Sequence, residues 1–229
     1  MGAVPPRSYF EQARPELVAQ LPARLGRLLD VGCGAGGVGR ALRDRVDFLA
    51  GIELEAEAAA RAREVYDEVL TGRAETLLAD LAGPFDTILA YDLLEHLTEP
   101  EALLRGLREL ASDNALLHVS VPNARHWTLV RDLVLRGTFG YTEWGHRDRT
   151  HLRWFTRADL VELLEASGWR VERTLHAPLT PAGRIAARAT GGRSAEFLVY
   201  QWSALSRNAS AGSPSPAGAE DRAAGAAPR

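Results

Sequence analysis

The chain has 229 residues, of which 46% are hydrophobic, and this size suits one α/β domain with a buried core. A formal net charge of -3 argues against a nucleic-acid partner. All 27 cationic side chains are arginine, so the chain has no lysine that could form a Schiff base. No apolar run approaches the roughly 20 residues of a membrane helix, so we expect no membrane partner.

The cysteine content and the N-terminal residues indicate the compartment. Cys33 is the single cysteine, so it cannot form an internal disulfide, and a reducing environment is expected. Residues 1–14 are charged and lack the apolar core of a signal peptide. We therefore expect a cytoplasmic protein.

Strands and helices alternate along the first half of the chain. Strands are predicted at 27–31, 48–53, 68–70, 85–91 and 115–121. Helices are predicted at 9–21, 37–45, 55–65 and 99–110, the last with Thr98 as its N-cap. Strands that recur at intervals of roughly 20 to 30 residues, with helices between them, favour βαβ units and a parallel sheet.

The second half departs from this alternation. Residues 124–155 are rich in aromatic side chains and are interpreted as an insertion that covers the carboxyl edge of the sheet. A helix at 157–167 follows, with Thr156 as its N-cap, and further strands are predicted at 169–175 and 195–205.

The predicted fold class is thus α/β, a Rossmann-like, seven-stranded and mostly parallel sheet with helices on both faces and an insertion after strand five. The domain is expected to span 1–205, with 124–155 as a substrate cap. From Ser206 the chain consists largely of alanine, glycine, serine and proline, so 206–229 is predicted to be a disordered tail.

A glycine-rich turn after the first predicted strand is the strongest motif. Gly32, Gly34 and Gly37 satisfy the pattern G-x-G-x-x-G, and Glu53 ends the next strand, where it can accept hydrogen bonds from two ribose hydroxyls. Asp30 precedes the glycines, where it would repel a dinucleotide pyrophosphate and stabilise an ammonium group. The alternative is a tight strand-to-helix turn that holds no ligand.

With these residues the sequence resembles the class I methyltransferases that depend on S-adenosylmethionine (SAM), from about Tyr9 to Leu205. The run from Phe85 to Asp92 is similar to the fourth-strand motif of that family. The resemblance implies SAM as cofactor. By this resemblance the cofactor-binding residues are Asp30, Gly32, Gly34, Gly36, Glu53 and Tyr91, with Glu75 taking the adenine contact because Arg73 stands where the family often has aspartate.

A second group of polar residues follows the fourth strand. Asp92, Glu95 and His96 lie there, and His151 lies near the end of the insertion. Two carboxylates and two imidazoles can hold a divalent metal ion such as Mg, Mn or Zn, which would lower the pKa of a bound hydroxyl. Two alternatives stay open: a metal-free role with His96, His151 or Glu95 in catalysis, and a purely structural role.

This second group also carries a resemblance. It is similar to the E-x-x-E-H segment of small-RNA 2'-O-methyltransferases, where a divalent metal is held, and of ubiquinone-pathway O-methyltransferases. Asp92 stands in place of the first glutamate of that motif. The segments 120–123 and 148–156 extend the likeness to a bacterial subgroup of ubiquinone-type methyltransferases from sugar and natural-product clusters. The resemblance implies O-methylation of a small hydroxylated molecule, such as a sugar or polyketide.

Several residues after the fifth strand are candidates for contact with this substrate. Asn123 could bind a hydroxyl or could instead cap the following helix, and the aromatic side chains could line a pocket or belong to the core. The candidate substrate residues are Asn123, His126, Trp127, Tyr141 and Trp144.

Two other functions are kept as alternatives to SAM-dependent methyl transfer. A nicotinamide-dependent oxidoreductase is disfavoured by Asp30 and by the lack of an evident second domain. A non-catalytic SAM-binding partner protein is disfavoured by the acids and histidines after the fourth strand. Stabilisation by SAM but not by NAD would exclude the first, and normal pathway function with both His96 and His151 replaced would favour the second.

Overall fold

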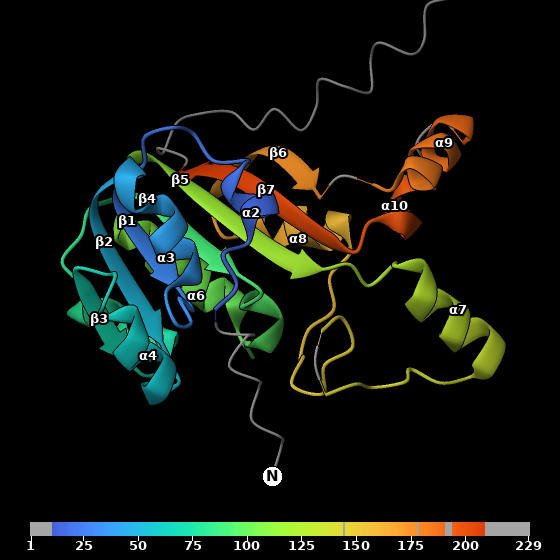
Figure 1. The fold of residues 1–229 in the computed structure, drawn as a ribbon, viewed down its shortest axis with the longest axis horizontal. Coiled ribbons are helices and arrows are strands. Elements are labelled where there is room, and N and C mark those ends of the chain that lie inside the picture. The colour runs from blue at the N-terminus through green and yellow to red at the C-terminus, as the bar shows by residue number, and fades with distance from the viewer. Residues whose placement is uncertain (1–10, 144, 178, 191–193, 209–229) are drawn as a thin grey trace, which may run out of the picture.

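The computed structural model describes residues 11–143, 145–177, 179–190 and 194–208 (Figure 1). Within them one seven-stranded sheet has the order β3-β2-β1-β4-β5-β7-β6. β1 to β5 are paired in parallel, and β7 runs antiparallel to both β5 and β6. The strands are β1 Gly26–Val31, β2 Val46–Glu53, β3 Glu68–Thr71, β4 Phe85–Tyr91, β5 Ala111–Pro122, β6 Trp169–His176 and β7 Gln201–Asn208. The predicted fold class is confirmed.

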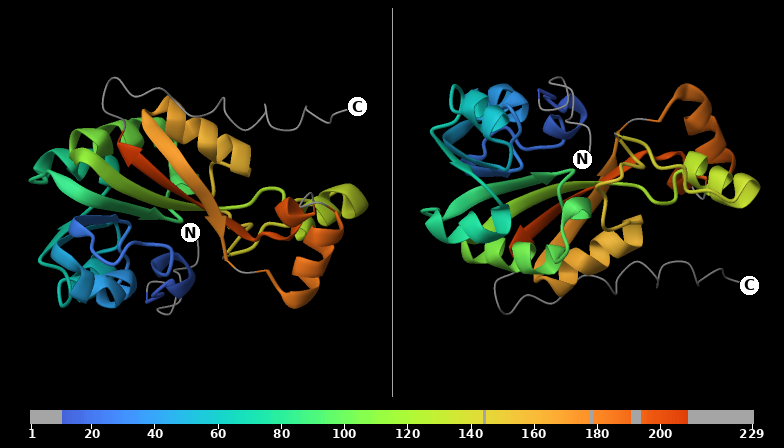
Figure 2. Two further views of the ribbon diagram at one scale, coloured as in Figure 1. Left: turned by 90° about the horizontal axis from the view of Figure 1, so that it is seen from above. Right: turned by 90° about the horizontal axis from the view of Figure 1, so that it is seen from below.

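Helices cover both faces of this sheet. α3 and α4 lie on one face, and α6 and α8 lie on the other (Figure 2). The helices are α2 Pro15–Val18, α3 Gly37–Leu42, α4 Ala56–Ala62, α5 Ala74–Leu77, α6 Pro100–Glu109, α7 Trp127–Arg136, α8 Arg157–Ala166, α9 Pro181–Ala189 and α10 Ala195–Leu198, with 3-10 turns η1 Arg43–Arg45, η2 Leu78–Asp80 and η3 Leu94–His96. None of the helices in the described part of the chain is long and apolar enough to span a membrane.

Alternation along the central strands divides the core into two layers. Leu28 and Leu29 are both fully buried, but they belong to different apolar clusters, and Leu116 and Leu117 are divided in the same way. Successive side chains of a strand point to opposite faces, so a strand that is covered on both sides is apolar throughout. Burial on both faces therefore holds the central strands in place, and their carboxyl ends carry polar groups.

The N-terminal helix is shorter than predicted in its described part. α2 begins only at Pro15, because Arg14 precedes a proline and adopts a left-handed φ of 46° instead of the helical conformation. Residues 9 and 10 of the predicted helix lie outside the described residues. The prediction of one helix over 9–21 is therefore wrong for residues 11–14 and for residues 19–21, which follow the end of α2.

Helix capping was predicted correctly at one helix and wrongly at another. Thr156 caps α8: its hydroxyl accepts a hydrogen bond from the Asp159 amide, and the Asp159 carboxylate accepts one from the Thr156 amide. Thr98 does not cap α6, because that helix begins at Pro100 with Glu99 in the N-cap position and no side-chain cap.

The last strand begins later and ends later than predicted. Residues 195–198 form α10, because the buried Asn123 amide donates hydrogen bonds of 2.7 Å to the Glu196 and Val199 carbonyls and holds a helical turn there. β7 then continues through Asn208, beyond the predicted domain boundary at residue 205. The rest of the predicted tail, 209–229, lies outside the described residues.

The insertion leaves and rejoins the sheet layer at one point. Asn123 and Phe155 form an isolated parallel bridge, and the Ala124 amide donates to the Phe155 carbonyl at 2.8 Å. Between these residues the chain forms α7, which the sequence analysis did not predict, and α7 lies beyond the end of the sheet (Figure 1). Asp132 anchors α7 to the following loop through Arg147, at 2.9 Å.

Candidate active site

Glu53 is held against the glycine-rich turn at the carboxyl ends of β1 and β2. Its carboxylate oxygens accept hydrogen bonds of 2.8 Å from the backbone amides of Gly34 and Glu55, and the residue is buried. Burial raises the pKa of Glu53, and the two amide donors oppose this shift. Each oxygen retains a lone pair, so the carboxylate can accept further donors at the turn.

The turn itself requires glycine at its exit. Gly36 precedes α3 with a φ of 83°, and a Cβ there would lie 3.3 Å from the Tyr66 ring. Gly32 and Gly34 also have positive φ values, of 81° and 56°. Together these conformations turn the backbone sharply beside Glu53.

Asp30 lies in β1 just before the turn and is almost fully buried. The Tyr66 hydroxyl donates to its carboxylate at 2.6 Å. Burial raises the pKa of Asp30 to about 7, although the Tyr66 hydrogen bond lowers it. Near neutral pH, small changes in the surroundings of Asp30 therefore decide whether its carboxyl group is protonated or ionised.

The other two predicted cofactor residues make contacts within the protein. The Tyr91 hydroxyl lies 2.7 Å from Nδ1 of the buried His118, so its side chain is engaged within the protein. The backbone of Tyr91, at the end of β4, is the part that could contact a cofactor. Glu75 pairs with Arg73 at 2.8 Å near the start of α5. Glu75, the candidate for the adenine contact, is therefore paired with the arginine that stands at the family's aspartate position.

Asp92 does not join the cluster that the sequence analysis predicted for it. It adopts a left-handed φ of 48° after β4, and its carboxylate pairs with Arg14 at 2.5 Å. The Ser120 hydroxyl and the Gln201 side-chain amide also donate to it. Because these groups satisfy the carboxylate, the structure does not bring Asp92 into the cluster, and its role as a metal ligand stays a prediction.

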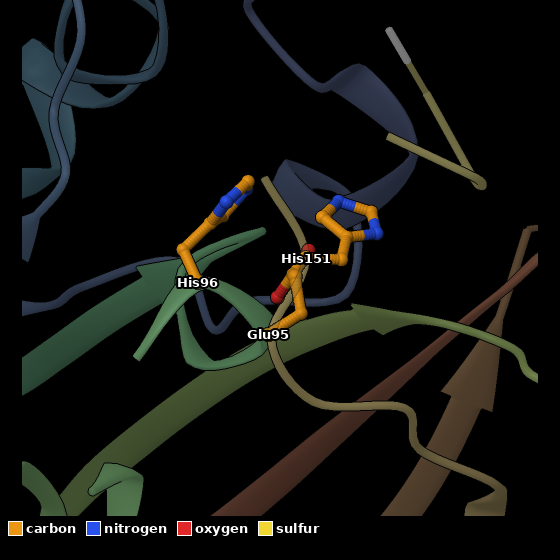
Figure 3. Close-up of side chains that lie close together, drawn as sticks. All are labelled: Glu95, His96 and His151. Atoms are coloured by element: carbon orange, nitrogen blue, oxygen red, sulfur yellow. The ribbon is translucent and has the colours of Figure 1, made fainter. Parts of the chain in front are cut away.

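Glu95, His96 and His151 do come together, from η3 and from the end of the insertion (Figure 3). Each offers a possible ligand atom, and these atoms lie within 4.8 Å of one another. The two imidazole rings are in edge contact, with centroids 4.8 Å apart. Glu95 is 1% exposed, and neither of its carboxylate oxygens accepts a hydrogen bond from another described residue.

Burial controls the charge of this cluster. It raises the pKa of Glu95 well above its usual range, and the neighbouring Asp92 carboxylate adds to that shift. It lowers the pKa of His151 to about 4 and also lowers that of His96. A buried carboxylate without a donor is costly, so the cluster is suited to a cation or to a proton-donating ligand.

Of the candidate substrate residues, Asn123 is engaged within the protein. Its side chain is fully buried, donates to two carbonyls of the α10 turn and accepts from the Arg125 amide at 3.0 Å. It therefore orders the entry to the insertion, as in the structural alternative, and a substrate contact of Asn123 stays an untested prediction. His126 is buried against Tyr200 and lies 2.8 Å from the Thr128 hydroxyl.

The aromatic candidates have different surroundings. Trp127 and Tyr141 are 45% and 50% exposed, so a ligand could reach both. Tyr141 packs on Phe139, which contacts Trp154, and Trp154 lies 5.5 Å from His151 between ring centroids. These rings extend from His151 toward the exposed part of the insertion. Trp144 lies outside the described residues.

Sequence reasoning missed three residues near the site. Arg14 reaches Asp92 and Gln201 from the N-terminal segment, and no local pattern indicated this. The Thr150 hydroxyl lies 3.0 Å from Nδ1 of His96. The position of Thr150 directly before the candidate His151 was a signal that could have indicated it. Leu54 is 58% exposed directly after Glu53, and an apolar residue at a strand end could have been noticed.

Comparisons with known proteins identify the family of the chain. A family described as methyltransferase domain matches residues 7–174. A ubiquinone biosynthesis O-methyltransferase from Xylella fastidiosa is 31% identical over 110 residues, which make up 45% of this chain and 45% of that protein. The chain thus matches about half the length of the curated relatives.

Solved structures share the fold. A SAM-dependent methyltransferase from Archaeoglobus fulgidus superposes with a TM-score of 0.66 at 15% identity, covering 88% of this chain and 94% of that one. Magnesium protoporphyrin IX methyltransferase from Synechocystis PCC 6803, with bound SAH, gives 0.59 at 17% identity and covers 89% and 83%. With a family match over most of its length and this shared fold, the chain belongs to the methyltransferase domain family.

Proposed function

We propose that the protein transfers a methyl group from SAM to a hydroxyl oxygen of a small molecule. The observation that carries this proposal is the buried Glu95 carboxylate, which faces two imidazoles and has no donor among the described residues. It follows β4, while the glycine-rich turn follows the neighbouring β1, so both sites lie at the carboxyl edge of the sheet. The O-methyltransferase likeness of the curated relatives supports oxygen as the acceptor atom.

The residues around the turn fit SAM. Glu53 would accept hydrogen bonds from the ribose hydroxyls with its free lone pairs, and Asp30 would stabilise the ammonium group. Leu54 offers an exposed apolar surface beside Glu53 for the adenine ring. SAM supplies the methyl group on a positively charged sulfur. The protein's part is to hold this donor in line with the acceptor oxygen.

The cluster of Glu95, His96 and His151 fits a divalent cation such as Mg, Mn or Zn. One carboxylate and two imidazoles are donors of mixed hardness, and the unsatisfied Glu95 oxygens have no other described partner. The ion would lower the pKa of the substrate hydroxyl. Without metal, a neutral imidazole would accept the hydroxyl proton, and burial keeps His151 neutral because its pKa is about 4.

The insertion is proposed as the substrate cap. It supplies His151 and the contacting rings of Phe139, Tyr141 and Trp154. Aromatic surfaces beside a polar cluster suit the ring of a sugar or polyketide whose hydroxyl reaches the cluster. We expect Trp127 and Tyr141 to contact such a substrate because both are partly exposed.

The experiment measures SAM binding by calorimetry and methyl transfer by mass spectrometry on a panel of hydroxylated sugars and polyketides. Wild type should bind SAM, and Glu53→Gln should weaken binding by about tenfold or more, because it loses hydrogen bonds to a charged group. Glu55→Gln is the matched control, because Glu55 is exposed and its side chain caps no helix.

The two parts of the proposal fail separately. Wild type that releases no heat with SAM and gains no thermal stability would refute the cofactor assignment. Binding of SAM with methyl transfer only to nitrogen or carbon would refute the hydroxyl assignment and leave the cofactor site intact.

A further inference from the structure

Thr150 forms a hydrogen-bonded link between His96 and a buried carboxylate. Its hydroxyl lies 3.0 Å from Nδ1 of His96 and donates to Oδ1 of Asp148 at 2.8 Å. Its backbone amide donates to the same Oδ1 at 2.8 Å. Asp148 is itself 7% exposed, so this carboxylate is a fixed acceptor in the wall of the site.

The number of protons available in this hydrogen-bonded link bears on which ring nitrogen of His96 is protonated. An ionised aspartate only accepts hydrogen bonds, and a threonine hydroxyl has one proton to donate. Since that proton is directed to Asp148, the Thr150 oxygen can only accept from His96. An imidazole that donates to this oxygen carries its proton on Nδ1 and keeps the lone pair on Nε2.

We propose that Thr150 and Asp148 are positioning residues that hold His96 in the Nδ1-protonated form, so that Nε2 is free to bind a metal ion or a substrate hydroxyl. The inference rests on the proposed function of the cluster, and it adds the residues that prepare one of its members. An imidazole that serves as ligand or base needs its other nitrogen fixed by a donor or acceptor, and the Asp148–Thr150 pair provides this for His96.

The same segment places the other members of the cluster. The amides of Leu152 and Arg153 donate to the Glu95 carbonyl at 2.7 and 3.0 Å, and His151 lies between them and Thr150. Docking of one short segment therefore brings His151 to the cluster, fixes the backbone of Glu95 and orients His96. The geometry couples the cap to the state of the candidate catalytic group.

The first test reads the tautomer directly. Long-range proton–nitrogen correlation spectra of 15N-histidine protein at about pH 8, where imidazoles are neutral, report which ring nitrogen is protonated. His96→Gln identifies the signal. Wild type and Thr150→Ser should show the Nδ1-protonated form, and Thr150→Val, which removes the acceptor and excludes water, should shift toward the Nε2-protonated form. A wild-type His96 ring protonated on Nε2 would overturn the proposal even if neither Thr150 variant folds.

The second test measures Mn²⁺ affinity by titration without SAM or substrate. Loss of a partner that orients a ligand costs 10- to 100-fold in metal affinity, so Thr150→Val should bind about tenfold more weakly, with Thr150→Ser close to wild type. Unchanged affinity in Thr150→Val, or equal loss in Thr150→Ser, would contradict the positioning role. Wild type that binds no Mn²⁺ but has the Nδ1-protonated ring would refute the metal assignment and support the positioning role.

Discussion

The hydroxyl of Tyr66 donates a 2.6 Å hydrogen bond to Asp30, and this joins the segment after α4 to the acid that precedes the glycine-rich turn. Burial raises the pKa of Asp30 to about 7, and the Tyr66 bond lowers it. The residue is therefore neutral in much of the free protein below neutral pH and charged above it.

SAM affinity should consequently fall as the pH falls through 7. A cationic ligand favours the ionised form of Asp30, so below that pKa binding must first displace a proton. We expect SAM to bind several-fold more weakly at about pH 6 than at about pH 7.5 in calorimetric titrations, with proton release to the buffer.

Two variants test whether the ionisation of Asp30 causes this pH dependence of SAM affinity. Asp30→Asn should bind SAM more weakly but with little dependence on pH. Tyr66→Phe removes a bond that lowers the pKa, so its affinity should begin to fall at a higher pH than in wild type. A flat wild-type profile across this range would argue that Asp30 does not meet the cofactor's cation.

Removal of metal should reduce methyl transfer. Dialysis against a chelator should lower the rate, and Mg²⁺ or Mn²⁺ should restore it, because the proposed ion lowers the pKa of the substrate hydroxyl. Glu95→Gln should lower Mn²⁺ affinity by about tenfold or more, since it removes the one carboxylate of the cluster.

Asp92→Asn is the matched control for this prediction. The Asp92 carboxylate is taken up by Arg14, Ser120 and Gln201, so Mn²⁺ affinity should stay near that of wild type. Equal loss in both variants would show that Asp92 joins the cluster when metal binds. A rate that chelation leaves unchanged would favour an imidazole as the base.

The anchor of α7 can be tested by proteolysis. The Asp132 carboxylate accepts hydrogen bonds from Arg131 and Arg147, both at 2.9 Å, and these bonds lower its pKa. Asp132→Asn should loosen α7, so trypsin should cleave after Arg131 and Arg136 faster than in wild type. Asp113→Asn, at an exposed acid, should digest like wild type, and equal digestion of all three proteins would reject the anchor.

The cap of α8 gives a prediction of stability. Thr156→Ala removes the side-chain oxygen that accepts from the Asp159 amide, and it should lower the free energy of unfolding by about 1 kcal/mol. Urea titrations measure this change, and Thr156→Ser should retain most of the wild-type value. No difference between alanine and serine would mean that the capping box contributes little.

The central sheet could be predicted because its signal is local. β4 has the predicted bounds, since a strand that is buried on both faces is a continuous apolar run between polar ends. α10 could not be predicted, because the turn at 195–198 is held by Asn123 from another part of the chain. The prediction of a strand from residue 195 was therefore wrong over 195–198.

The candidate site divides in the same way. Glu95 and His96 are neighbours in the chain, and their position after a strand was enough to place them at the sheet edge with His151. The arrangement of Asp92 was out of reach, because its left-handed backbone and its pairing with Arg14 depend on contacts distant in sequence. The binding roles of these residues, and a cytoplasmic location, stay predictions.

The adjacent ends of the insertion offer a route for divergence. Because Asn123 and Phe155 lie side by side, the stretch between them can lengthen, shorten or be exchanged at little cost in loop closure. Since His151 belongs to that stretch, one exchange would alter acceptor choice and the proton-accepting group together. The proposed SAM-binding residues, which lie outside the insertion, would remain unchanged, so a new acceptor specificity could arise without a change in the methyl-donor site.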